Sequence, residues 1–192
     1  PKMERRLEEI LSRQKVRLAN YKPGELKRRA EEVFQLFNEA WSVNWGHVPL
    51  TRRQFDHLLH EVKPLLRPEL VQLLLDGDRL VGFGIVVPDL NPLVQKFNGR
   101  FNLVDKLRLL YAAKFGPVRK VRAMVIGISQ PYQLKMLNYA IVLRIYLNIA
   151  KHLPVEFADF SLIPENLRHW IKVIKAFGGQ QYKTFRVFER EI

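Results

Sequence analysis

The first fifty residues carry apolar side chains at helical spacing. Residues 2–18 alternate charged residues with Met3, Leu7, Ile10 and Leu11, which predicts an amphipathic helix and a helical amino-terminal extension over residues 1–20. Residues 25–41 repeat one apolar stripe and predict a second helix that packs on a core. Thr51 stands where it can cap a third helix, because apolar residues follow it at helical period.

The middle of the chain has the pattern of a β-hairpin. Residues 69–75 and 79–87 are apolar and β-branched, and Asp76-Gly77-Asp78 separates them with a step that favours positive φ in a tight turn. The run over residues 80–87 has little polar alternation, which is typical of a strand covered on both faces. We therefore expect a sheet between helices. Residues 93–98 and 103–115 read as short helical or irregular segments.

The second half of the chain alternates strands with helices. The pattern predicts strands over residues 118–128, 154–163 and 182–189, and helices over 133–152 and 165–177. Gly178-Gly179 marks the end of the last helix. Neither a repeat nor a second domain boundary is visible. The sequence thus predicts one α/β domain over residues 1–192, with a central mixed sheet flanked by helices.

Composition narrows the functions open to this chain. Its 192 residues are 47% apolar, which suits one compact domain with a real core. Cysteine is absent, so disulfides, thiolate metal ligands and thiol nucleophiles are excluded. No apolar run approaches the roughly 20 residues of a membrane span, and the first residues lack the apolar stretch of a signal peptide. We expect a cytoplasmic location and no membrane partner.

Charge points to an anionic partner. The formal net charge is +13, and residues 100–122 hold seven cations against one acid, Asp105. This predicted partner patch would attract an acidic macromolecule, whereas an ordinary solvated surface is the alternative. The patch consists of Arg100, Lys106, Arg108, Lys114, Arg119, Lys120 and Arg122.

Several segments resemble the GNAT N-acetyltransferase superfamily. The order of predicted elements is similar to the GNAT fold over most of the chain. Phe37-Asn38-Glu39-Ala40-Trp41, the segment from Asn44 to Thr51, Val81-Gly82-Phe83 and Pro88-Asp89-Leu90-Asn91 are similar to a bacterial GNAT-like family of hypothetical acetyltransferases. The ending after Gly178-Gly179 fits that family too. Its members are longer, and this chain resembles their carboxy-terminal half. The resemblance implies acyl transfer from a thioester to an amine.

The resemblance also implies a donor site. In the GNAT fold an acyl-pantetheine arm pairs with the central strand, here at Val125, Ile126, Gly127 and Ile128. The next loop, with the pattern Gln/Arg-x-x-Gly-x-Gly/Ala, cradles the pyrophosphate of coenzyme A at a helix start. The resemblance aligns Gln133, Lys135 and Asn138 with this loop, but only Gln133 fits the pattern.

Met136 and Asn138 stand where glycine and a small residue are expected, so we predict weak coenzyme A binding. An acylated phosphopantetheine on an acyl carrier protein presents a single phosphate and is the second donor considered. Carrier proteins are acidic, which the basic patch would complement. The alternative is that Met136 and Leu137 are core residues.

Catalytic residues are not identified by sequence. Many GNAT enzymes carry a tyrosine as the thiolate acid near the end of the last helix, and Ile174 occupies that position here. The strand from residue 123 to 128 has no carboxylate to serve as a base. His47, Asp89 and Glu165 are candidate bases acting through water, with capping or surface roles as the alternative. Trp41, Asn44 and Trp45 are candidates for an acceptor pocket, and ordinary aromatic packing is the alternative for them.

His57 and His60 lie three residues apart on a predicted helix but have no third ligand at a recognisable spacing, so no metal site is predicted. Two functions stay open. One is an N-acyltransferase that uses acyl-CoA or an acyl carrier protein, and the other is a catalytically silent GNAT-like module that binds an acidic protein or a nucleic acid through its basic face. Nucleic acid has the weaker support, because no known nucleic-acid-binding motif is present.

Overall fold

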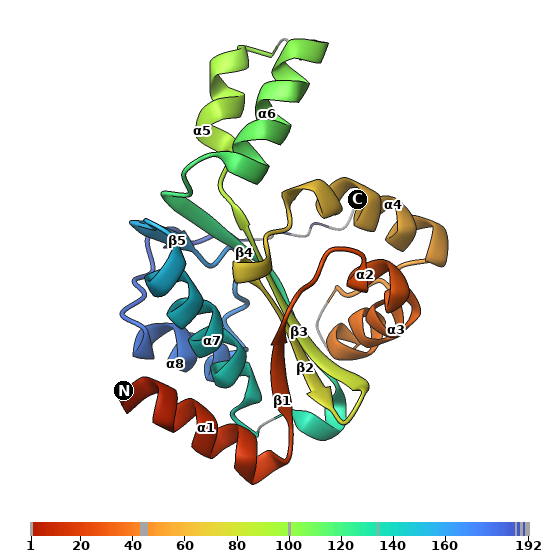
Figure 1. Cartoon of the computed structure of the whole chain (residues 1–192), viewed down its shortest axis with the longest axis vertical. Coiled ribbons are helices and arrows are strands. Elements are labelled where there is room, and N and C mark those ends of the chain that lie inside the picture. The colour runs from red at the N-terminus through yellow and green to blue at the C-terminus, as the bar shows by residue number, and fades with distance from the viewer. Residues whose placement is uncertain are drawn as a thin grey trace. The chain divides into compact units, whose positions relative to one another are not determined.

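The computed structural model describes residues 2–42, 46–99, 101–133, 135–186, 188 and 190. The chain divides into two compact units, Pro1–Asp159 and Phe160–Ile192. The first unit holds a five-stranded mixed sheet in the order β1-β2-β3-β4-β5 with helices on both faces, as the sequence predicts (Figure 1).

The predicted hairpin is confirmed. β2 (Val71–Asp76) pairs antiparallel with β3 (Arg79–Pro88), and Gly77 in the turn has a φ of 57°. β4 (Lys120–Ile128) pairs antiparallel with β3, and β5 (Phe157–Asp159) pairs parallel with β4. The strand predicted over residues 154–163 is therefore shorter, because its pairing with β4 covers three residues.

The prediction of a helix up to Leu18 is wrong at its end. α1 (Lys2–Gln14) stops before Lys15, which has a φ of 54°, and β1 (Arg17–Asn20) then pairs antiparallel with β2. The free edge of β2 supplies backbone partners that four residues of modest strand propensity would not find locally. Residues 1–20 are therefore integral to the first unit, with Leu7 and Ile10 buried.

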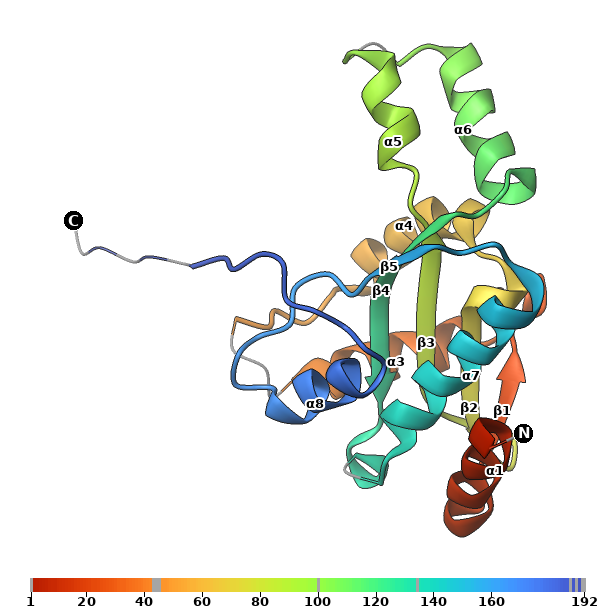
Figure 2. The same cartoon turned by 90° about the vertical axis from the view of Figure 1, so that its left-hand side faces the viewer.

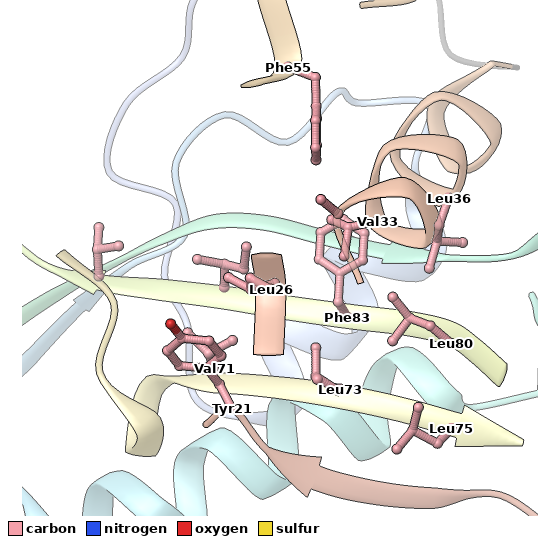
Figure 3. Packing of buried hydrophobic residues seen from close by; sticks show 13 residues of the cluster. Tyr21, Leu26, Val33, Leu36, Phe55, Val71, Leu73, Leu75, Leu80 and Phe83 are labelled. Atoms are coloured by element: carbon pink, nitrogen blue, oxygen red, sulfur yellow. The ribbon is translucent and has the colours of Figure 1, made fainter. Parts of the chain in front are cut away.

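One face of the sheet is covered by α2 (Glu25–Arg28), α3 (Ala30–Trp41) and α4 (Arg52–Val62). Thr51 caps α4 in a reciprocal capping box with Gln54, as predicted. Figure 3 shows the core on this face, where Phe83 of β3 lies beneath Val33 and Leu36 of α3.

The opposite face is covered by α7 (Leu137–His152), which α1 contacts in turn (Figure 2). Gly84 of β3 allows this close approach, because a Cβ there would lie 2.5 Å from Cγ2 of Ile141. α7 begins four residues later than the predicted helix over 133–152, so Gln133 lies in the preceding loop.

An arm forms the connection between the paired strands β3 and β4. α5 (Asn91–Val94), the short 3-10 helix η3 (Gln95–Phe97) and α6 (Leu103–Phe115) project together beyond the end of the sheet (Figure 2). We call residues 91–115 the α5–α6 arm. Both segments that the sequence left between helical and irregular structure are thus helical.

The second unit contains α8 (Arg168–Ala176), which ends before Gly178 at a φ of 81°. The terminal strand predicted over 182–189 is wrong for residues 182–186, which have no regular structure, while Val187 and Glu189 lie outside the described residues. Tyr182 and Phe185 are exposed, so the apolar pattern there is not buried by sheet pairing. Across the described ranges, no helix is both long enough and apolar enough to cross a membrane.

Candidate active site

β4 and β5 form a fork. Their parallel ladder has three pairs, from Lys120↔Phe157 to Arg122↔Asp159, and β5 ends there. Beyond this point β4 continues to Ile128, paired with β3 on its other side. Val125 and Ile126, two of the predicted donor-binding residues, are half-buried on this part of β4. An extended chain with amide groups can therefore pair with β4 where β5 does not.

A β-bulge lies just past the fork. Ile85 pairs with Val125 and Val86 with Ala123, so Met124 is the extra residue. Residues three apart on a regular strand point to opposite faces. The bulge changes this, because Arg122 pairs with Val87 and Val125 pairs with Ile85, and both partners belong to the core on the α3 side. Arg122 and Val125 therefore share the α3 face.

Asp159 brings a carboxylate to the apex of the fork. It pairs with Arg122 in the ladder, and its Oδ2 lies 3.4 Å from Nε of Arg122. The Asp159 side chain is 17% exposed, so this acid is largely enclosed beside the part of β4 that parts from β5. The same face carries Gly127 further along β4.

Trp41 of α3 covers Gly127. A Cβ at Gly127 would lie 2.8 Å from Cζ3 of the indole, so glycine is what lets the ring lie on the strand. The Trp41 ring also packs against Phe37 and Phe83, with centroids 4.8 Å and 6.3 Å away. Trp41 is half-buried beside β4, which keeps both the acceptor-wall role and the packing role available. Asn44 and Trp45, the other two predicted acceptor residues, lie outside the described residues.

Glu39 ties the loop after β4 to α3. Its Oε1 accepts hydrogen bonds from the Ser129 hydroxyl at 2.7 Å and the Gln130 amide at 2.8 Å. Ser129 is buried, and the Gln130 side chain also donates to the Ser42 hydroxyl at 3.2 Å. The carboxylate thus fixes the start of the loop that leads to the predicted donor residues.

Further hydrogen bonds close the rest of this loop. The predicted donor residue Gln133 donates from Nε2 to the carbonyl oxygen of Ile128 at 3.2 Å. Tyr132, in the 3-10 helix η4 (Gln130–Tyr132), donates its hydroxyl to Asp76, and this hydrogen bond raises the pKa of the phenol above its ordinary value. The Lys135 ammonium lies 5.0 Å from the Tyr132 ring centroid. Lys135 is exposed at the start of α7, where an anion could meet it.

Met136 adopts the backbone conformation that glycine favours. Its φ is 59° and its ψ is 14°, and it is the residue before α7. The GNAT glycine was aligned with this position, so the backbone keeps the turn although the side chain differs. Met136 is 47% exposed, which contradicts the alternative that it is a core residue. Leu137 is buried, which agrees with that alternative. The Met136 side chain is thus exposed on the loop before α7.

Asn138 reduces the anion-binding capacity of the α7 start. Its Oδ1 accepts from the backbone amide of Tyr139 at 2.8 Å, so one of the first amides of the helix is already satisfied. Lys135 and the other amides at the start of α7 are the groups that an anion could meet there.

The three candidate bases lie in different parts of the chain, with His47 and Asp89 in the first unit and Glu165 in the second. Asp89 forms a turn, since its Oδ1 accepts from the Asn91 amide at 3.0 Å and its own amide donates to Lys120 at the opposite end of β4 from the loop. Glu165 lies in the second unit, exposed and 3.0 Å from Arg186. His47 is half-buried, with Nε2 enclosed and without a hydrogen-bond partner in the described part of the chain.

The predicted partner patch is divided between two places. Lys106, Arg108 and Lys114 lie on α6, whereas Arg119, Lys120 and Arg122 lie at or just before the start of β4. Arg119 forms an ion pair with Glu156 at 2.6 Å, and Arg122 forms one with Asp159 at 3.4 Å. Arg100 lies outside the described residues. The acids that balance the β4 cations come from a distant segment, which the local charge count could not include.

Sequence reasoning missed Asp159, Glu39 and Ser129. The sequence placed Asp159 inside a longer strand, and no pattern marks where β4 and β5 part. Glu39 falls within the quoted motif around Trp41, so its position next to that tryptophan was the available signal. Its contact with Ser129 joins residues 90 positions apart, and only the folded chain reveals it.

Two curated proteins are similar to this chain in sequence. No family model matches the chain. The chain is 22% identical over 198 residues to Protein YghO of Escherichia coli (strain K12), spanning 100% of this chain and 50% of that protein. It is 24% identical over 170 residues to the bacterial ceramide synthase of Caulobacter vibrioides (strain NA1000 / CB15N), spanning 86% of this chain and 44% of that protein. The chain thus spans about half the length of these curated relatives.

Solved structures give the fold. The aminoglycoside N-acetyltransferase AAC(6')-Iy, in complex with the bisubstrate analogue CoA-S-monomethyl-acetylneamine, matches with a TM-score of 0.54 and 12% identity. The match covers 92% of this chain and 99% of that one. The chain therefore has the GNAT acetyltransferase fold, as its sequence predicts.

Proposed function

We propose that this protein is an N-acyltransferase that moves an acyl group from a thioester donor to an amine. The observation that carries the proposal is the fork of β4 and β5, in which a bulged β4 leaves its backbone beyond Met124 without a β5 partner. An acyl-pantetheine arm is a chain of amide groups of the length and shape that such a strand edge accepts. In the proposed reaction the amine nitrogen attacks the thioester carbonyl carbon, a C–N bond forms and the C–S bond breaks. The proton lost by the amine ends on the sulfur.

Asp159 is the proposed proton acceptor. It lies at the apex of the fork on the α3 face, the face that also carries Gly127 and Trp41. A carboxylate there can attract the ammonium form of the acceptor and take its proton directly or through one water. The ion pair with Arg122 holds the carboxylate in place.

The loop before α7 favours a donor with one phosphate. Met136 projects its side chain at the glycine position, and Asn138 occupies one helix-start amide. Lys135 and the remaining amides suit an acylated phosphopantetheine carrier protein better than acyl-CoA. The similarity to a ceramide synthase supports a long-chain amino alcohol as the acceptor, because a ceramide is the N-acyl derivative of one. The aromatic wall of Trp41 and Phe37 beside β4 fits such an apolar acceptor.

An assay with two donors and two acceptors tests the proposal. The purified protein is incubated with palmitoyl-CoA or palmitoyl carrier protein, and with sphinganine or a short polar amine. Mass spectrometry then measures the amide product. We expect amide formation with sphinganine, faster from the carrier protein. If neither donor gives an amide while the protein still binds an acidic partner, the silent binding module is the better description.

A further inference from the structure

α6 exposes an apolar face that the proposed reaction does not use. Five of its large apolar side chains are between 55% and 73% exposed. We call them the α6 stripe, and they are Leu103, Val104, Leu107, Tyr111 and Phe115. Burial of a large apolar side chain stabilises a protein, so a helix that leaves five of them in water forgoes a large stabilisation.

The stripe is continuous along the helix. At 100° per residue its five members fall within an arc of about 120°. The opposite side of α6 carries Asp105 and Ala113, which are buried, and α6 contacts η1 (Lys63–Leu65) of the body. The stripe therefore faces away from the body of the first unit.

The arm is held firmly enough to present this face. The Arg67 guanidinium donates from Nε to the carbonyl oxygen of Ala113 at 2.7 Å and from an Nη to that of Gly116 at 2.8 Å. It thereby satisfies carbonyl groups at the end of α6. Burial lowers the pKa of Arg67, and Glu69 opposes this. Asn102 and Asp105 form a capping box at the start of the helix.

Cations frame the stripe. Lys114 falls within its arc, with its ammonium 5.5 Å from the Phe115 ring centroid, and Arg108 borders one edge. Lys106 is exposed on the other flank of the helix. Asp105 is the acid of α6, and it lies on the buried side. Exposed apolar and aromatic side chains bordered by Lys and Arg are a combination with which a protein surface can bind an anionic bilayer.

We propose that the α5–α6 arm docks this protein on the surface of an anionic membrane, with the α6 stripe inserted at the level of the lipid head groups. A bilayer interface asks for apolar area and positive charge and for no matched hydrogen bonds, which is what the stripe offers. The arm projects beyond the end of the sheet, so the stripe is presented clear of β1–β5 (Figures 1 and 2). The expectation of no membrane partner rested on the lack of a spanning segment, and a surface helix needs none.

This docking does not depend on acyl transfer. If the proposed function holds as well, docking would bring the fork to the membrane in which a long-chain amine dissolves. The two proposals are separable, because vesicle binding is measured without donor or acceptor and transfer can be measured with both substrates in detergent micelles.

Vesicle flotation of the 192-residue chain tests the proposal. The vesicles contain phosphatidylethanolamine with phosphatidylglycerol, or neutral phosphatidylcholine alone. We expect binding to the anionic vesicles that weakens as salt rises, because exposed charges are screened beyond roughly 8 Å at physiological ionic strength. The double variant Leu107→Ser with Tyr111→Ser should lower partitioning about tenfold or more. Lys106→Glu with Lys114→Glu should lower it by a similar factor.

Matched controls separate the stripe from general effects. Leu162→Ser removes an exposed leucine of the second unit, and Lys27→Glu with Lys172→Glu makes the same net charge change at exposed residues that do not belong to the arm. Both controls should bind vesicles nearly as the wild type does. Circular dichroism and thermal unfolding check that each variant folds. We expect folding to be retained, because substitutions at exposed positions usually cost little stability.

Two other occupants of the stripe are outcomes of the same series. Sedimentation velocity without lipid detects a second copy of the chain, and titration with acyl carrier protein detects an acidic protein. The membrane proposal is overturned if the wild type does not bind vesicles but associates with itself or with the carrier protein, and if Leu107→Ser with Tyr111→Ser abolishes that association. Equal vesicle binding by the stripe variant and the wild type overturns it too.

Discussion

At the scale of single residues, two positions combine unusual conformation or placement with a role in the proposed site. Met136 takes a left-handed conformation that a Cβ makes costly, and its exposed side chain gains little packing in return. Asp159 is a largely enclosed acid at the point where two strands part. Each can be changed with a close control.

Met136→Gly should stabilise the protein by about 1 kcal/mol, because removing the Cβ relieves the left-handed strain by more than the added chain entropy costs. Met136→Ala keeps the Cβ and should change stability little. Urea unfolding measures both free energies. The glycine variant should also bind coenzyme A more tightly in calorimetry, as the thioether no longer projects there. Equal stability of the two variants would show that this residue is not strained.

Asp159→Asn should lower kcat/KM for amide formation by about a hundredfold or more if the carboxylate accepts the proton. Glu156→Gln is the matched control, since Glu156 also pairs with an arginine ahead of the fork, at 2.6 Å from Arg119. Urea unfolding measures the stability of both variants. A purely structural Asp159 would instead give a loss of stability with little change in kcat/KM for the folded protein.

At the scale of elements, the arm depends on one side chain of the body. Arg67 reaches the carboxyl end of α6 and donates hydrogen bonds to carbonyl groups that have no partner within the helix. The bulge in β4 works at the same scale, since one extra residue brings Arg122 and Val125 to one face. The arrangement of the site and of the arm therefore depends on local irregularities within regular elements.

Arg67→Met should destabilise the arm by about 2 kcal/mol, because charge-assisted hydrogen bonds to buried carbonyl groups are lost. Arg53→Met removes an exposed arginine of α4 and is the control. Hydrogen exchange should accelerate in residues 103–115 of the Arg67 variant and stay unchanged in β2 and β3. Unchanged exchange in α6 would mean that other contacts hold the arm.

At the scale of the whole molecule, the net charge of +13 hides an uneven distribution. The cations of α6 face solvent around an apolar stripe, whereas Arg119 and Arg122 are engaged by acids of the segment before and within β5. The predicted partner patch therefore separates into solvent-facing cations on α6 and cations at the start of β4 that pair with acids.

Paired charge reversals should separate these two regions. Arg119→Glu with Arg122→Glu places like charges beside Glu156 and Asp159, and should cost roughly 1 kcal/mol or more of unfolding free energy. Lys106→Glu with Lys114→Glu makes the same charge change at two exposed positions of α6 and should cost little, because exposed positions tolerate substitution. Thermal unfolding in low salt measures both. Equal costs would mean that the β4 pairs add no stability.

The sequence by itself determined the elements whose burial follows a regular period. The helices around Val33 and Phe55 and the hairpin at Gly77 were predictable because amphipathic spacing and turn chemistry are local. The left-handed conformation at Met136 was not predicted, because the sequence shows only that a methionine stands where the GNAT motif has glycine.

Tertiary structure decided what depends on partners distant in the chain. β1 is a strand because the edge of β2 is free to pair with it, and β5 stops where its ladder with β4 stops. α6 is apolar on two sides, so its period could not say whether Leu107 or Ala113 faces the body, and packing against η1 chose Ala113. Asp159 reaches the site for the same reason, because strand pairing places it beside Arg122, 37 positions earlier in the chain.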